Sequence, residues 1–141
     1  VPCKDAPRSI PESQREPLPK ELQRKQDIDI IEKVNGPTDW VSSIVIVGKP
    51  NNEDRICLDP KRLNNAVIRK HHYIQKLEDV IPQLSNEKVF RKLDARSGYW
   101  SVILDKESKF LTTFNTPFRR YCFKRLPFGL VSAQDIFQRD I

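Results

Sequence analysis

The sequence predicts an α+β domain, because short helices and β-hairpins follow one another without the strand–helix–strand rhythm of a parallel sheet. Its 141 residues suffice for one domain or part of one, at about 100–200 residues per domain. Eleven prolines disfavour long helices. No apolar run reaches the ~18 residues that cross a bilayer, so we expect no membrane segment. The chain begins without methionine and stops inside an expected helix at 133–141, so we expect a piece of a longer polypeptide.

The first half of the chain predicts a connector followed by a hairpin. Residues 1–27 carry five prolines among mostly polar side chains, so we expect an extended segment with at most a short helix over 20–26. The β-branched run VSSIVIV at 41–47 predicts a strand. The turn signal Pro50-Asn51-Asn52 leads to a returning strand at 55–59. Alternation on that strand places Ile56 and Leu58 on one face and Arg55, Cys57 and Asp59 on the other.

The middle of the chain predicts a helix and a strand. Apolar residues recur at helical spacing over 75–84, and Pro82 should kink or shorten this helix. Residues 89–93 predict a short strand that ends at Asp94.

The last third predicts a second hairpin and a final helix. Segments 111–114 and 121–125 flank a turn that contains Pro117. Ser132 begins the helix, where its hydroxyl can cap free amides and Asp135 completes a capping box.

Charge is unevenly distributed. The net charge is +6, but residues 1–54 carry −2, residues 55–125 carry +9 and residues 126–141 carry −1. Concentrated positive charge attracts a polyanion, because neutralising phosphates releases counterions. A solvated basic face with no partner is an equally good interpretation.

The cysteines and histidines predict no metal or disulfide site. Cys3, Cys57 and Cys122 are odd in number and lack both zinc spacing and disulfide density, which indicates unpaired thiols in a reducing, intracellular setting. His71 and His72 are adjacent, so a strand would point them to opposite faces, and we interpret them as ordinary surface residues.

Asp94 is the most informative single residue. A carboxylate at the end of a strand, beside a turn, can reach a bound ion from a rigid support. Capping of the following turn is the alternative role. No second carboxylate lies nearby in sequence at catalytic spacing, although a two-metal phosphoryl-transfer site needs one. Motifs of serine hydrolases, P-loops and dinucleotide-binding folds are absent.

Four ordered motifs surround this aspartate: RICLDPKRLN at 55–64, LDARSGYW at 93–100, LTTFNTPF at 111–118 and LPFGLVSAQDIFQR at 126–139. Together they make residues from about 30 to 141 resemble the reverse transcriptase domain of gypsy-like LTR retrotransposon Pol polyproteins. The resemblance implies a right-hand polymerase fold, of which this chain supplies the fingers and the first part of the palm. The implied division is a connector at 1–29, fingers at 30–82 and 103–131, and palm at 83–102 and 132–141.

The resemblance implies that the parent protein is an RNA-directed DNA polymerase. Asp94 matches the first catalytic aspartate, which with the backbone carbonyl of Ala95 would hold Mg²⁺ (or Mn²⁺) against the incoming triphosphate. The implied partners are an RNA or DNA template–primer, dNTPs and the rest of the Pol polyprotein: remaining palm, thumb, RNase H and integrase. The implied location is the cytoplasm, or a retrotransposon particle within it.

The resemblance also implies a nucleotide pocket. Arg55 matches the triphosphate-binding arginine, and a guanidinium fork suits phosphate oxygens. Tyr99 matches an aromatic steric gate that leaves no room for a 2′-hydroxyl, and Phe128 and Gly129 match residues lining the pocket. Simple core packing is the alternative for Tyr99 and Phe128.

Three departures from the family pattern concern local loops. Gln134 stands where a proline is usual in the first helical turn, and Arg119 where a glycine is usual in the hairpin turn. Residues 27–30, DIDI, replace a stretch that usually contains glycine and fewer acids.

The family's second acidic motif, an aromatic-X-Asp-Asp hairpin, is expected beyond residue 141. Without it Asp94 cannot assemble a two-metal site, so we expect this chain alone to be inactive. The alternative is a non-catalytic nucleic-acid-binding remnant or a domesticated interaction module, because binding a phosphate backbone needs only basic side chains.

Overall fold

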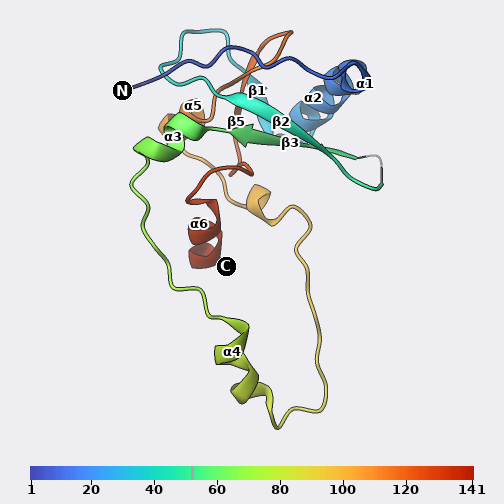
Figure 1. Cartoon of the computed structure of the whole chain (residues 1–141), viewed down its shortest axis with the longest axis vertical. Coiled ribbons are helices and arrows are strands. Elements are labelled where there is room, and N and C mark those ends of the chain that lie inside the picture. Colours follow the sequence, from blue (N-terminus) through green and yellow to red (C-terminus); the bar gives the residue numbers. More distant parts are fainter. Residues whose placement is uncertain (52) are drawn as a thin grey trace.

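The computed structural model describes residues 1–51 and 53–141 as a compact body from which a long arm extends and returns (Figure 1). The elements along the chain are α1 (Glu12–Arg15), α2 (Pro17–Asp27), β1 (Ile31–Lys33), β2 (Ser43–Gly48), β3 (Asp54–Asp59), α3 (Lys61–Ala66), α4 (Leu77–Val80), η1 (Ile81–Leu84), η2 (Gly98–Ser101), α5 (Lys106–Leu111), β4 (Phe114–Asn115), β5 (Arg120–Phe123) and α6 (Ala133–Asp140). This mixture confirms the α+β class. In the part of the chain that the structure describes, no helix combines the length and the apolar character needed to cross a bilayer.

Both predicted hairpins form, and together they build two antiparallel sheets. β2 pairs with β3 so that Ile46 faces Ile56, and the second hairpin pairs β4 with β5. β1 adds to the other edge of β5, which gives the strand order β1-β5-β4. A bridge between Ser42 and Phe114 joins the two sheets. Of the predicted turn at 50–52, residue 52 lies outside the described residues.

The hydrophobic core lies between these sheets and α2. Phe114 is its centre, with ring centroids 5.8 Å from Tyr121 and 5.2 Å from Phe123. α2 contributes Leu18 and Leu22, both almost fully buried. The N-terminal segment was expected to be extended with a helix over 20–26 at most, and the observed helix is longer and part of the core. The helix can begin earlier because Pro17 and Pro19 both lie in its first turn, where the backbone needs no N–H donor.

The end of α2 contains one of the predicted departures. Asp29 adopts the left-handed conformation, with φ 64°. The Ile30 N–H donates to the Lys25 carbonyl at 2.9 Å and the Asp29 N–H to Gln26 at 3.0 Å, which is the Schellman pattern of helix termination. Glycine adopts this conformation without a steric penalty, whereas the Cβ of Asp29 makes it unfavourable. The Asp29 carboxylate forms an ion pair with Lys124, which can offset part of this cost.

The hairpin turn with Arg119 is closed by a threonine. The Thr116 hydroxyl donates to the Arg119 carbonyl at 2.7 Å and accepts from the Arg119 N–H at 3.0 Å and the Phe118 N–H at 3.2 Å. Among the described residues, only Asp29 and Ser97 are non-glycine residues with positive φ. Arg119 therefore fits this turn without needing the freedom of a glycine.

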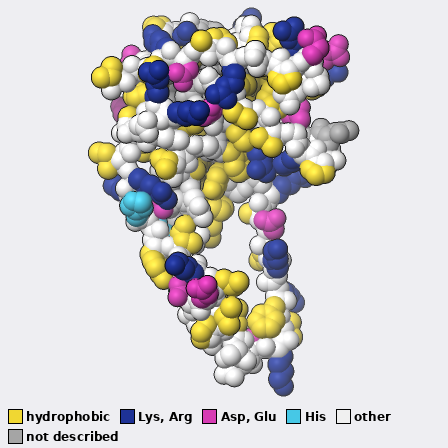
Figure 2. Space-filling model, viewed as in Figure 1, with side chains coloured by type: hydrophobic (Ala, Val, Ile, Leu, Met, Phe, Trp, Pro, Cys, Tyr) yellow, Lys and Arg dark blue, Asp and Glu magenta, His cyan; other side chains and the backbone are white. Residues whose placement is uncertain are grey.

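The arm comprises residues 67–97 and differs from its sequence prediction. The helix expected over 75–84 forms as α4 followed by the tighter 3₁₀ segment η1, which contains Pro82. The strand expected over 89–93 does not form. A strand needs a neighbour to satisfy its backbone groups, and among the described residues none pairs with this limb of the arm. Large apolar side chains on the arm are exposed, including Ile68, Leu77, Val89 and Leu93 (Figure 2).

Asp135 on α6 holds the start of the arm, and the predicted capping box is wrong. Ser132 makes no side-chain cap hydrogen bond. The buried Asp135 carboxylate instead accepts from Arg69 Nε at 2.6 Å and from the His72 backbone N–H at 3.3 Å. The Arg69 hydrogen bond, more than any other contact, holds the pKa of Asp135 below its usual value. A carboxylate three residues into a helix thus serves a long-range contact.

We predict that Asp29→Gly raises the melting temperature by about 3–5 °C, because it removes the cost of a left-handed non-glycine residue at the end of α2. Asp29→Ala is the matched control: it also loses the Lys124 pair but keeps the strain, so its melting temperature should fall. Thermal unfolding followed by circular dichroism measures both. A lower melting temperature for Asp29→Gly would show that the ion pair outweighs the strain.

Candidate functional site

One cavity of about 630 Å³ collects side chains that are far apart in sequence. Arg55 comes from β3, Asp94 and Ala95 from the end of the arm, Tyr99 from η2, and Phe128 from the loop before α6. The structure thus brings together all but one of the predicted site residues; Gly129 lies outside the lining.

Phe128 is the centre of an aromatic and cationic cluster at this cavity. The Arg55 guanidinium carbon lies 4.6 Å from the Phe128 ring centroid, which is cation–π geometry. The Tyr99 ring is 4.9 Å from Phe128 and meets Phe137 edge-on at 5.4 Å. Tyr99 is half-buried, so it packs against other rings and also borders the cavity.

The turn between Asp94 and Tyr99 is strained at a position that the sequence did not reveal. Ser97 has a left-handed backbone with φ 50°. Gly98 is needed for a different reason: a Cβ there would lie 2.6 Å from the Phe137 ring. The glycine therefore lets η2 pack closely against α6, while Ser97 makes the reversal.

Asp94 presents an exposed carboxylate to the cavity. Within residues 1–51 and 53–141 it forms no side-chain hydrogen bond or ion pair, and no set of three metal-binding side chains is found. Asp94 with the Ala95 carbonyl offers two oxygen ligands. Magnesium commonly binds proteins through one or two carboxylates and completes its shell with water and phosphate oxygens, so these donors fit part of such a site.

Gly129 acts on the backbone instead of lining the cavity. Its φ is +112°, and a Cβ would lie 1.9 Å from the Leu58 carbonyl oxygen. On either side of this close approach, the Leu58 N–H donates to the Phe128 carbonyl and Asn64 Nδ2 donates to the Gly129 carbonyl, each at 3.0 Å. Gly129 thereby fixes the Phe128 loop against β3.

Sequence reasoning missed two basic residues of this site. Lys49, just after β2, and Arg96, in the turn after Asp94, also line the cavity. These two residues are far apart along the chain, so no local sequence pattern indicated that they would lie at the same cavity. The signal that was available is the position of Lys49 beside the hairpin turn that precedes Arg55.

Comparisons with known proteins agree on one family. The family model described as "Reverse transcriptase (RNA-dependent DNA polymerase)" matches residues 47–141. The chain is 29% identical over 137 residues to the "Enzymatic polyprotein" of Figwort mosaic virus (strain DxS), covering 94% of this chain and 20% of that protein. It is 31% identical over 135 residues to the "Retrovirus-related Pol polyprotein from transposon 412" of Drosophila melanogaster, covering 92% of this chain and 11% of that protein.

Solved structures show the same fold. A foamy viral protease-reverse transcriptase in complex with double-stranded DNA matches 99% of this chain and 24% of that chain, with a TM-score of 0.81 and 20% identity. The foamy viral protein in complex with an RNA/DNA hybrid matches with a TM-score of 0.78 and 20% identity, covering 99% of this chain and 19% of that chain. The chain spans about a fifth or less of the curated relatives described above.

We predict that Gly129→Ala lowers the free energy of unfolding by at least ~2 kcal/mol, because the new methyl group overlaps the Leu58 carbonyl and the positive φ disfavours any side chain. Gly36→Ala is the matched control, since a Cβ there meets nothing within 4 Å, and it should change stability by less than ~0.5 kcal/mol. Urea unfolding measures both. Equal effects would contradict the close approach at Gly129.

Proposed function

This chain belongs to the reverse transcriptase family, and we propose that it forms the fingers (30–82 and 103–131) and the first part of the palm (83–102 and 132–141) of an RNA-directed DNA polymerase. The fold shared with the foamy viral proteins supports a reverse transcriptase fold, and the division itself follows from the sequence motifs. We further propose a retrotransposon Pol polyprotein of the gypsy-like type as the parent protein, with template–primer and dNTPs as substrates. The similarity to the transposon 412 polyprotein supports the retroelement origin.

The observation that carries the proposal is that Arg55 on β3 borders the same cavity as Asp94, at the end of the arm, and Tyr99 on η2. In the proposed reaction the primer 3′-oxygen attacks the α-phosphorus of a dNTP. Asp94 and the Ala95 carbonyl would hold a divalent ion, Mg²⁺ or Mn²⁺, which when bound neutralises charge on the transferred phosphoryl group and orients the 3′-oxygen.

Arg55 binds the triphosphate in this proposal. Its guanidinium group can donate two parallel hydrogen bonds to phosphate oxygens. The Phe128 ring, 4.6 Å away, supports the guanidinium from one face, which limits its motion before the nucleotide arrives. Lys49, on the border of the same cavity, adds positive charge where the phosphates would lie.

Tyr99 sets sugar specificity in this proposal. Phe128 and Phe137 hold its ring from two directions, so the ring cannot easily move away from an incoming sugar. A fixed ring against C2′ leaves no space for a 2′-hydroxyl, which favours deoxynucleotides by shape.

The described residues supply one of the carboxylates that a two-metal reaction needs. We therefore propose that catalysis requires further acidic residues of the full-length protein, and that the 141-residue chain alone does not extend a primer.

We predict that Asp94→Asn in the full-length protein lowers primer extension by at least ~10³-fold, because it removes the charge that holds the metal. Binding of the labelled primer–template should stay within ~2-fold, since phosphate contacts dominate it. Asp39→Asn, an exposed carboxylate outside the cavity, is the matched control and should leave extension unchanged. Extension retained in Asp94→Asn would refute the proposed role.

The same experiment tests the second candidate function, a non-catalytic nucleic-acid-binding module. The basic returning limb of the arm favours it: Lys88, Arg91 and Lys92 are exposed, and none has an ion pair among the described residues (Figure 2). Such a module would bind primer–template with strong salt dependence in fluorescence anisotropy, and its full-length wild-type form would show no extension.

We predict that Tyr99→Val in the full-length protein lowers discrimination against ribonucleotides by at least ~10-fold in kcat/KM, because it opens space beside C2′. Tyr99→Phe keeps the ring and should keep the discrimination. Single-nucleotide incorporation with paired dNTP and rNTP substrates measures the ratio, and a melting curve checks folding. An unchanged ratio in a folded Tyr99→Val variant would mean that the ring only packs the core.

A further inference from the structure

Asp135 is a buried carboxylate that the proposed reaction does not use. It is the third residue of α6, and its side chain is 5% exposed. A buried carboxylate needs charge and hydrogen bonds that compensate the loss of water. Arg69 Nε donates to one of its oxygens at 2.6 Å, and the His72 backbone N–H donates to the other at 3.3 Å. Asp135 therefore joins α6 to the first residues of the arm.

The other side of α6 faces the tyrosine of the candidate site. Phe137 follows Asp135 by two positions, and successive helical residues are about 100° apart, so the two side chains leave the helix on nearly opposite sides. The Phe137 ring meets the Tyr99 ring edge-on at 5.4 Å. A Cβ at Gly98 would lie 2.6 Å from the same ring. α6 thus lies between the two ends of the arm, joined to one by an ion pair and to the other by aromatic packing (Figure 1).

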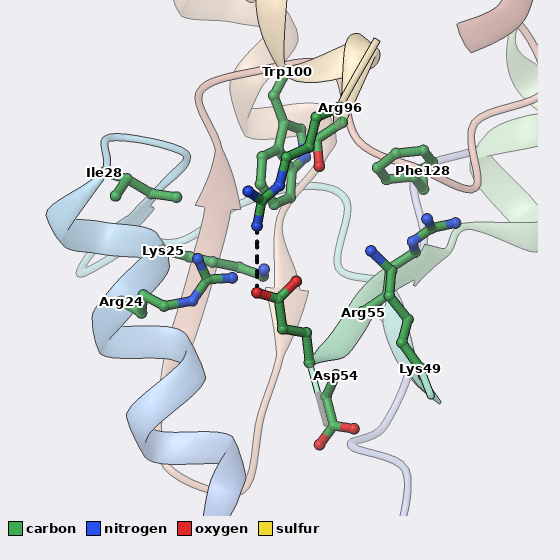
Figure 3. A pocket seen from close by; sticks show the side chains of 11 residues that line it. Arg24, Lys25, Ile28, Lys49, Asp54, Arg55, Arg96, Trp100 and Phe128 are labelled. Atoms are coloured by element: carbon green, nitrogen blue, oxygen red, sulfur yellow. Dashed lines mark hydrogen bonds and ion pairs between the residues drawn. The ribbon is translucent and has the colours of Figure 1, made fainter. Parts of the chain in front are cut away.

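The Tyr99 ring has two aromatic supports, and they are fixed in different ways. Phe128, 4.9 Å away, is also a wall of a smaller cavity of about 270 Å³, where it faces the Arg55 guanidinium group (Figure 3). The Phe128 backbone is held by the hydrogen bond from the Leu58 N–H at 3.0 Å. Phe137, in contrast, is carried by α6, so its position depends on the rotation of that helix about its own axis.

Few buried side chains fix this rotation. Of the eight residues of α6, the buried ones are Ala133 and Asp135. Ala133 offers only a methyl group, so the ion pair with Arg69 is the directional contact. A charge-assisted hydrogen bond of this kind is about twice as strong as a neutral one. The Arg69 hydrogen bond also holds the pKa of Asp135 below its usual value, so the carboxylate stays ionised at neutral pH.

We propose that Asp135 is a positioning residue for the Tyr99 ring. Together with Arg69 it fixes the rotation of α6, which places Phe137 against that ring. This role rests on the proposed function, in which Tyr99 selects the sugar of the incoming nucleotide. Asp135 is not among the residues that line the cavity, so its effect on nucleotide choice passes through α6.

The test is single-nucleotide incorporation by the full-length protein with paired dNTP and rNTP substrates. Asp135→Asn keeps the size of the side chain and removes its charge, and we expect discrimination against ribonucleotides to fall ~3–10-fold in kcat/KM. The fall should come from faster rNTP incorporation, because general damage to the site would slow both substrates. Arg69→Gln should have the same effect, and Arg69→Lys, which keeps the charge, should lie between Arg69→Gln and the wild type.

Glu32→Gln is the matched control. Glu32 forms a partly buried ion pair with Lys109, 77 residues away, and this pair joins β1 to α5 without involving α6 or the arm. Its loss should leave the dNTP-to-rNTP ratio within ~1.5-fold of the wild type, since the two sites share no partner. An equal fall in Glu32→Gln and Asp135→Asn would show a general loss of stability and would overturn the proposal.

A double-variant cycle with Tyr99→Val separates positioning from a direct role. If Asp135 acts through the Tyr99 ring, Asp135→Asn should not lower discrimination further once that ring is removed. A further fall of ~3-fold or more in the double variant would overturn the proposal, because it would require another route. Melting curves verify that each variant folds. Arg69→Gln, whose side chain is 39% exposed in the wild type, carries the same comparison if Asp135→Asn does not fold.

The Tyr99→Val single variant distinguishes a failure of this role from a failure of the proposed function. If Tyr99→Val lowers discrimination while Asp135→Asn and Arg69→Gln leave it unchanged, Tyr99 selects the sugar without help from α6, and the positioning role alone is wrong. If Tyr99→Val leaves discrimination unchanged as well, the sugar-selecting role of the ring fails, and the role of Asp135 fails with it.

Discussion

The close approach of the Phe128–Gly129 loop to β3 is the constraint on which the rest of this site depends. The Leu58 N–H bonds to the Phe128 carbonyl, and only a glycine at 129 leaves room for the Leu58 carbonyl. Arg55 lies on the same strand as Leu58, so this contact places the Phe128 ring against the Arg55 guanidinium group. Because Phe128 also contacts Tyr99, the position of one loop decides where the arginine, the tyrosine and the two cavities lie.

A second set of contacts joins the arm to this centre. Asp135 on α6 binds Arg69 where the arm begins, and Phe137 on the same helix packs against Gly98 where it ends. α6 therefore contacts both ends of the arm where it joins the body, while the rest of the arm extends away from the body (Figure 1). Between these two contacts, large apolar side chains of the arm are exposed, so the arm has little packing against the body to support regular secondary structure.

Charged side chains are unevenly placed around the site. Arg55 borders both the larger cavity and a smaller cavity of about 270 Å³ between the end of α2 and the β2–β3 hairpin. The smaller cavity carries Lys25, a buried lysine whose pKa is lowered by desolvation. On the larger cavity the exposed Asp94 offers negative charge. Three cations, Lys49, Arg55 and Arg96, border the same cavity as this carboxylate. The arrangement fits the nucleotidyl transfer proposed above, in which a hard cation would bridge the carboxylate to phosphate oxygens.

The sequence by itself determined the features that short segments encode. The two hairpins follow from β-branched runs and turn residues close together in the chain, and the motifs around Arg55 and Asp94 carry the family resemblance. Only the tertiary structure decided the rest. The strand expected at 89–93 lacks a neighbour to pair with, and Asp135, expected as a helix cap, binds Arg69, a partner 66 residues away. Pairing and burial depend on residues distant in sequence, and no local pattern records them.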